Sequence, residues 1–213
     1  MFRILTLLIF LSILSGGASA ATFGKCRFDT AKLSFEGTEQ EQAKCLLRKV
    51  KILGNVDSNP AALPPNLAGL IGKPTGIAIA KLQSYASSKG LSEADLGGSF
   101  TDKLSRGNNN DPDAPFARYF VIHDTSSPLL RALPFPSDID TSNFVNRLDR
   151  WESPEAVAHI FLNRKGETYV GHKFSVPWRA PRLESNKVGV PSKGLFLHVE
   201  NIQPRAPQQS GTF

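Results

Sequence analysis

The stretch YFVIHDTSSP, residues Tyr119 to Pro128, opens the part of the chain whose pattern indicates a sheet. An aromatic and aliphatic run leads into His123, and the chain then turns polar and reaches a proline. Such a short β-prone run predicts a buried strand over Arg118–Ile122. His123 would then stand at the end of a strand, either as an ordinary structural residue or as a ligand of a metal site.

Two later segments also predict strands. AHIFLN (Ala158–Asn163) turns at Lys165-Gly166 and returns as ETYV, which is the pattern of a β-hairpin. GLFLHVE (Gly194–Glu200) is rich in apolar residues and ends on a carboxylate. Between these strands we expect a helix over Asp138–Trp151, because several apolar residues there fall on one helical face. Strands mixed with helices predict a mixed α/β domain with a central sheet.

The first twenty residues, MFRILTLLIFLSILSGGASA, predict a signal peptide. Arg3 gives a positive start, Ile4–Leu14 is an apolar core, and Ala18-Ser19-Ala20 is a small-residue cleavage site. The apolar run is short for a membrane span, although an uncleaved anchor is the alternative. We therefore expect a secreted or periplasmic protein whose mature chain begins near Ala21.

The two cysteines, Cys26 and Cys45, lie early in the mature chain. In an exported protein a disulfide between them is the default, and two buried free thiols are the alternative. Residues 21–110 are expected to form a small helical region. Its helices are predicted over Thr38–Val50 and Thr75–Ser88, with a Pro- and Gly-rich connector over Asn59–Pro74.

The polar segment RGNNNDPDAP (Arg106–Pro115) predicts a break, and we expect a second domain over residues 115–213. The composition of the 213 residues, 40% hydrophobic and 21% charged, is that of a globular protein. A net charge of +6 suits anionic cell wall, anionic lipid or nucleic acid. No nucleic-acid-binding motif supports the last of these.

Four features at strand ends or in nearby loops are candidates for chemistry: His123-Asp124, His159, PWRAP (Pro177–Pro181) and Glu200. Each has a structural alternative, since a lone histidine or tryptophan is often part of a core. His159 is expected to pack or hydrogen-bond beneath the site, and His198 shares a strand face with Glu200. A neutral imidazole is a good zinc ligand, and a carboxylate near zinc can take a proton from bound water. His123 and Glu200 would suit these roles if their strands are neighbours.

Four segments, in order and in approximate spacing, resemble those of the zinc-dependent N-acetylmuramoyl-L-alanine amidases. The family includes bacterial amidases, phage lysozyme-type amidases and peptidoglycan recognition proteins. The segments are YFVIHDTSSP, AVAHIFLNRKGETYV, PWRAP and KGLFLHVEN, within about residues 115–205. The resemblance implies a mixed sheet flanked by helices. It also implies hydrolysis, with Zn²⁺ as cofactor, of the amide between N-acetylmuramic acid and L-alanine in peptidoglycan or muropeptide.

The resemblance assigns roles to five residues. His123 would be the first zinc ligand and Glu200 the catalytic base. Asp124, Trp178 and Arg179 would line the substrate cleft. Arg179 stands where the family usually has a histidine, and it can hold a peptide carboxylate through a bidentate pair.

One family feature is missing after Glu200. The family supplies a histidine and then a Cys, Asp or His as further zinc ligands, but the tail NIQPRAPQQSGTF contains none of these residues. The chain is then a truncated product, or it binds muropeptide without cleaving it, or His198 or His172 substitutes. We favour truncation, which predicts uncovered apolar surface.

Two other functions are open at this stage. A non-catalytic peptidoglycan-binding module would need no metal. A glycosidase would use Asp124 and Glu200 as its carboxylate pair, at a separation of about 5–10 Å that the sequence does not fix. We expect a monomer that has no stable membrane insertion after the signal peptide is removed.

Overall fold

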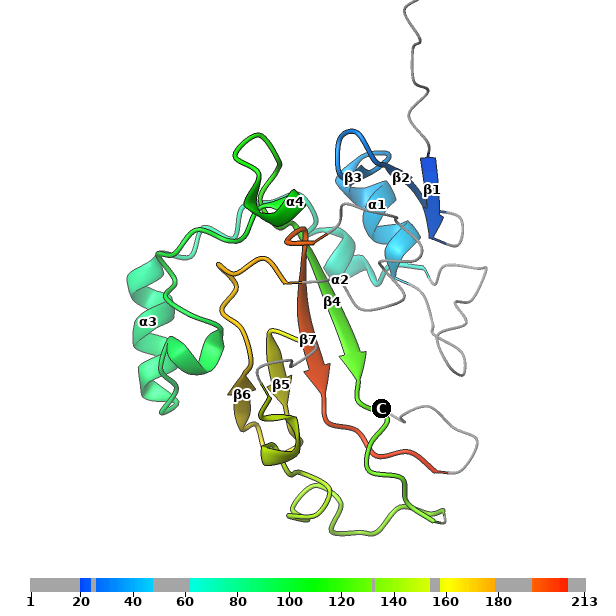
Figure 1. Cartoon of the computed structure of the whole chain (residues 1–213), viewed down its shortest axis with the longest axis vertical. Coiled ribbons are helices and arrows are strands. Elements are labelled where there is room, and N and C mark those ends of the chain that lie inside the picture. The colour runs from blue at the N-terminus through cyan, green and yellow to red at the C-terminus, as the bar shows by residue number, and fades with distance from the viewer. Residues whose placement is uncertain are drawn as a thin grey trace, which may run out of the picture.

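The structure is a computed structural model that describes residues 20–23, 26–47, 62–131, 133–153, 158–178 and 193–206. It contains a four-stranded mixed sheet, a smaller antiparallel sheet and a few short helices (Figure 1). The prediction of a mixed α/β fold with a central sheet is confirmed at this level. Most of the predicted signal peptide, residues 1–19, lies outside the described residues. No helix in the described ranges is both long and apolar enough to cross a membrane.

The larger sheet has the strand order β4-β7-β5-β6. Its strands are β4 (Tyr119–Asp124), β5 (Ile160–Leu162), β6 (Thr168–Val170) and β7 (Phe196–Asn201). β7 lies between β4 and β5 and runs parallel to both, whereas β5 and β6 form the predicted antiparallel hairpin. Gly166 turns this hairpin with φ +83°, a conformation that glycine adopts without strain. All four strands predicted after residue 115 are present.

The smaller sheet was not predicted. Its strands are β1 (Ala20–Phe23), β2 (Cys26–Asp29) and β3 (Ser34–Phe35), and they pair in that order. Strands of two to four residues are too short to show a clear alternating pattern in the sequence. The N-terminal region is therefore partly β-structure, where the sequence predicted helices alone.

Helix α1 (Glu39–Leu46) confirms the predicted N-terminus of the first helix. Thr38 caps it, and Glu41 completes a capping box by accepting a hydrogen bond from the Thr38 backbone N–H at 2.7 Å. Residues 48–50 of that prediction lie outside the described residues. Cys45 on α1 is disulfide-bonded to Cys26 on β2, as predicted. Such a crosslink is typical of proteins that fold outside the cytoplasm.

The other helices are short. They are α2 (Pro65–Ala68), α3 (Ile79–Ser88), the 3₁₀ turn η2 (Ala94–Leu96), α4 (Gly107–Asn110) and the 3₁₀ turn η3 (Asp149–Trp151). α2 lies in the segment predicted as a connector, and α3 begins four residues later than predicted. The predicted polar break contains α4, where Asn108 and Asn109 have positive φ values. Asparagine tolerates this left-handed conformation better than most residues.

The helix predicted over Asp138–Trp151 is wrong. The described residues there form successive turns, and only Asp149–Trp151 makes a 3₁₀ turn. Asn146 explains part of the difference, because its Nδ2 donates to the carbonyl oxygens of Ile139, Asp140 and Ser142. A side-chain amide that bonds to nearby carbonyls stabilises a turn at the expense of a helix.

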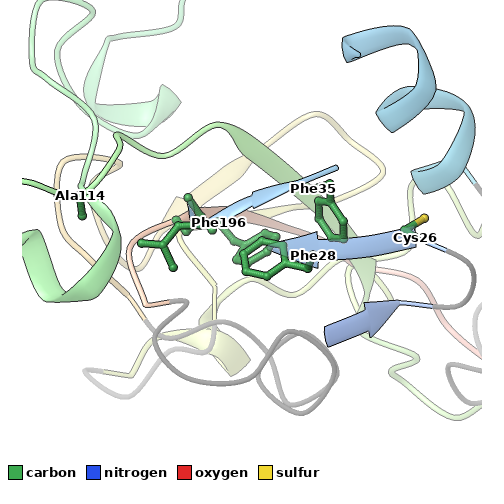
Figure 2. Close-up of a cluster of buried hydrophobic side chains, with 7 residues drawn as sticks. Cys26, Phe28, Phe35, Ala114 and Phe196 are labelled. Carbon is green, nitrogen blue, oxygen red and sulfur yellow. The ribbon is translucent and has the colours of Figure 1, made fainter. Parts of the chain in front are cut away.

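The two sheets share one hydrophobic core, shown in Figure 2. Phe28 and Phe35 of the small sheet pack edge to face, and Phe35 contacts Tyr119 of β4 in the same way. Tyr119 in turn packs against Phe196 of β7. Aromatic contacts of this kind add to the energy of burial. The small sheet therefore covers the beginning of β4 and β7 and leaves the far ends of these strands to other segments.

Candidate functional site

His123 and Glu200 lie side by side at the far ends of β4 and β7. The two strands are parallel, and His123 pairs with Glu200 in their register. Glu200 is 8% exposed. From the sequence, the proposed roles of these two residues required their strands to be neighbours. The strands are neighbours.

One face of the sheet carries both residues. Side chains two apart on a strand share a face, which places Tyr119 and Val121 with His123, and Phe196 and His198 with Glu200. The shared core covers the Tyr119–Phe196 end of this face. A second apolar cluster lies beyond it and consists of Phe161 of β5 and Tyr169 of β6 with Leu148, Trp151 and Ala158. Between the two clusters lies a strip of polar side chains, formed by His123, Glu200, His198 and His159.

His198 and His159 are both fully buried, with 0% of their surface exposed. The His198 ring lies 6.3 Å from the His123 ring, measured between centroids. Neither ring nitrogen of His198 has a hydrogen-bond partner in the described part of the chain. Burial, together with the neighbouring His159 and His123, lowers the pKa of His198 to about 3, so the ring is neutral at pH 7.

His159 stacks on His198 with ring centroids 5.6 Å apart and planes 6° apart. Its Nδ1 accepts a hydrogen bond from the His198 backbone N–H at 3.1 Å, so Nε2 carries the proton and donates to the Val176 carbonyl at 3.3 Å. Burial lowers the pKa of His159 to about 4. Because both nitrogens are used, His159 supports the strip beneath the site, as the sequence predicted, and is a poor metal ligand.

The strip continues to the remaining histidine. His172 lies 6.5 Å from His159 between ring centroids and stacks on Trp178 at 3.7 Å. All four histidines of the chain therefore form one continuous array with Trp178. Sequence reasoning missed the array as a unit. The array forms through the β5–β7 pairing, which brings His159 beside His198 and which no pattern in the sequence indicates.

The side chain of Asp124 does not lie beside that of His123. It follows His123 on β4 and therefore points to the opposite face. Its carboxylate accepts hydrogen bonds from the Ser126 backbone N–H and hydroxyl, which fixes the turn after the strand. The two carboxylates proposed for a glycosidase, Asp124 and Glu200, therefore lie on different faces of the sheet. Arg179 lies outside the described residues.

A three-ligand zinc site is not assembled by the described residues. Among them, no three His, Cys, Asp or Glu side chains converge closely enough to hold a metal ion. His159 is excluded by its hydrogen bonds, and Asp124 by its direction. The donor set in the described ranges therefore does not fit the catalytic zinc site that the resemblance implies.

The opposite face of β4 is apolar and open. Phe120 is 62% exposed and Ile122 is 69% exposed. Phe120 makes an edge-to-face contact with Phe174, which covers part of it.

No protein-family model matches the chain, and neither the curated proteins nor the solved structures contain a match.

Proposed function

We propose that this protein acts on peptidoglycan as an N-acetylmuramoyl-L-alanine amidase, with Glu200 as the general base. The observation that carries the proposal is the pairing of His123 with Glu200 at the ends of two adjacent parallel strands. The resemblance assigns these two residues to one catalytic centre. That assignment requires them to lie close together, and the β4–β7 register supports it. Loops and strand ends on a rigid sheet are common places for active sites.

The chemistry assigned to Glu200 is proton transfer. An ionised carboxylate can accept a proton from an attacking water and pass it to the nitrogen of the departing L-alanine. β7 is an inner strand of the larger sheet, so its backbone is held on both sides by β4 and β5. A fixed position suits a general base, because proton transfer needs a short and well-aligned contact. The described residues do not complete a ligand set for zinc, so the proton transfer is assigned to Glu200 alone.

The incomplete set of zinc ligands among the described residues favours a second function, which is binding of muropeptide without cleavage. A domain with the peptidoglycan-facing surface of an amidase and an incomplete metal site would bind muropeptide without cleaving it. Trp178 and the histidine array would then serve as a rigid wall of the ligand site. The candidate is supported by the described residues, among which no three metal-ligating side chains converge.

One experiment separates the two functions. Purified protein is incubated with a soluble muropeptide, with and without added Zn²⁺, and products are identified by mass spectrometry while bound zinc is measured by elemental analysis. The amidase predicts release of a peptide with a free L-alanine amine and an intact sugar. Binding of the muropeptide with no released peptide in either condition would establish the binding module instead.

A further inference from the structure

A groove lies at the beginning of β4, at the opposite end of that strand from His123. Its volume is about 580 Å³. Three segments far apart in the sequence line it, namely helix α1, residues 72–74 and the pair Arg118-Tyr119. The proposed amidase chemistry makes no use of this groove.

The groove carries a positive charge. Lys73 and Arg118 both line it and are exposed, and neither forms an ion pair with another described residue. Glu39 also lines it, so the charged side chains sum to 2 − 1 = +1. The Glu39 carboxylate lies against Gly72, where a Cβ would collide with it. An exposed lysine and arginine in one groove form a natural contact for a carboxylate.

The wall of the groove is fixed by hydrogen bonds. The Tyr119 hydroxyl accepts from the Phe35 backbone N–H at 2.9 Å and donates to Gln42 Oε1 at 3.1 Å. Gln42 Nε2 donates to the Gly37 carbonyl at 3.0 Å. The disulfide of Cys45 ties α1 to the small sheet. A wall held in place before binding reduces the entropic cost of binding a ligand.

We propose that this groove binds a carboxylate-bearing peptide, with Lys73 and Arg118 as its cationic contacts. This inference rests on the proposed function for the source of the peptide, which is the stem peptide of peptidoglycan. Tyr119 and His123 are four residues apart on β4, or roughly 13 Å. Four extended residues span roughly 13–14 Å, so a stem peptide of four or more residues has the length to reach from the candidate centre to Tyr119 at the groove. The N-terminal region, which supplies α1 and Lys73, thereby gains a role in holding substrate.

The test uses the full chain and a fluorescently labelled stem tripeptide, L-alanyl-γ-D-glutamyl-L-lysine, in a fluorescence-anisotropy titration at low salt. A second probe has its carboxylates converted to amides. We expect the amidated probe to bind at least 10-fold more weakly. The double variant Lys73→Gln/Arg118→Gln should lose a similar factor for the acidic probe and show no preference between the two probes.

The matched control is Lys81→Gln/Lys103→Gln, which removes the same charge from exposed positions outside the groove. It should bind the acidic probe like wild type. Equal binding by wild type and the groove variant, or no binding by wild type, would overturn the proposal. The probe contains no muramic acid and no scissile bond, so the result does not depend on cleavage. Groove-dependent binding without muropeptide cleavage would leave this inference standing while the amidase function fails.

Discussion

The His159 ring stacks on the His198 ring at 5.6 Å and accepts a hydrogen bond from the backbone N–H of that same residue. One histidine of this pair is fully hydrogen-bonded, and the other has no partner for either ring nitrogen in the described part of the chain. His198 shares a face of the sheet with His123 and Glu200, and its ring lies 6.3 Å from the His123 ring. The contrast between the two rings leads to the first two predictions.

Stability should fall as the pH falls from about 6.5 to about 4. The folded-state pKa of His159 is lowered to about 4 by burial, whereas an unfolded histidine titrates near 6.5. Between these values the unfolded chain binds a proton that the folded chain does not, so acid favours unfolding. The loss for this residue should approach roughly 1.4 kcal/mol per pH unit within the window. Urea unfolding at several pH values measures it.

The control for that prediction is His159→Gln, which retains an acceptor and a donor but does not titrate. Its free energy of unfolding should depend less on pH between 6.5 and 4 than that of wild type. An unchanged pH dependence would show that His159 is not buried in its neutral form.

Replacing His198 by leucine should leave the stability unchanged or raise it by roughly 1–2 kcal/mol. The buried ring makes no hydrogen bonds to described residues, so an apolar side chain of similar size removes a desolvation cost. His159→Leu should instead destabilise by about 1–3 kcal/mol, because it leaves the buried His198 N–H without its acceptor. Thermal and urea unfolding compare the two variants. A large loss for His198→Leu would reveal a partner for that ring.

Removing the disulfide with Cys26→Ser/Cys45→Ser should lower the free energy of unfolding by about 3 kcal/mol. The crosslink closes a loop of 19 positions, which restricts the unfolded chain. Urea unfolding measures the loss. A reducing agent should destabilise wild type and leave the double variant unaffected; equal effects on both would assign the loss to something other than this bond.

The variant Ile122→Thr should reduce self-association while changing stability by less than about 1 kcal/mol. Ile122 is 69% exposed on the open face of β4, so it contributes little to the core, and threonine keeps the β-branched shape that suits a strand. Light scattering at increasing protein concentration measures the association. Leu197→Thr, at a buried position on β7, is the contrasting variant and should destabilise strongly. Unaltered scattering by Ile122→Thr would mean that this face does not drive association.

Much of the larger sheet could be predicted because its strands are apolar runs bounded by turns. Lys165-Gly166 marked the hairpin, and the run ending at Glu200 marked an inner strand. The helix expected over residues 138–151 failed because apolar spacing alone does not reveal that Asn146 bonds to three nearby carbonyls. The small sheet could not be predicted because its strands have too few residues to show the two-residue alternation of apolar and polar side chains.

The sequence indicated the individual residues of the candidate site, but it did not indicate which of them lie together in the fold. His123 and Glu200 each end an apolar run, which singles them out, but only the β4–β7 register places them together. The histidine array depends on the pairing of β5 with β7, which joins residues 39 positions apart. Asp124 looked equivalent to His123 in sequence, and strand alternation sends it to the other face.

The most direct test of the central claim is the rate at which Glu200→Gln releases L-alanine-linked peptide from muropeptide, compared with wild type. Glutamine has nearly the same shape and cannot accept the proton, so the rate should fall by about 10²- to 10⁴-fold while muropeptide affinity is retained. A Glu200→Gln variant that releases peptide at the wild-type rate would contradict the assignment of Glu200 as the base.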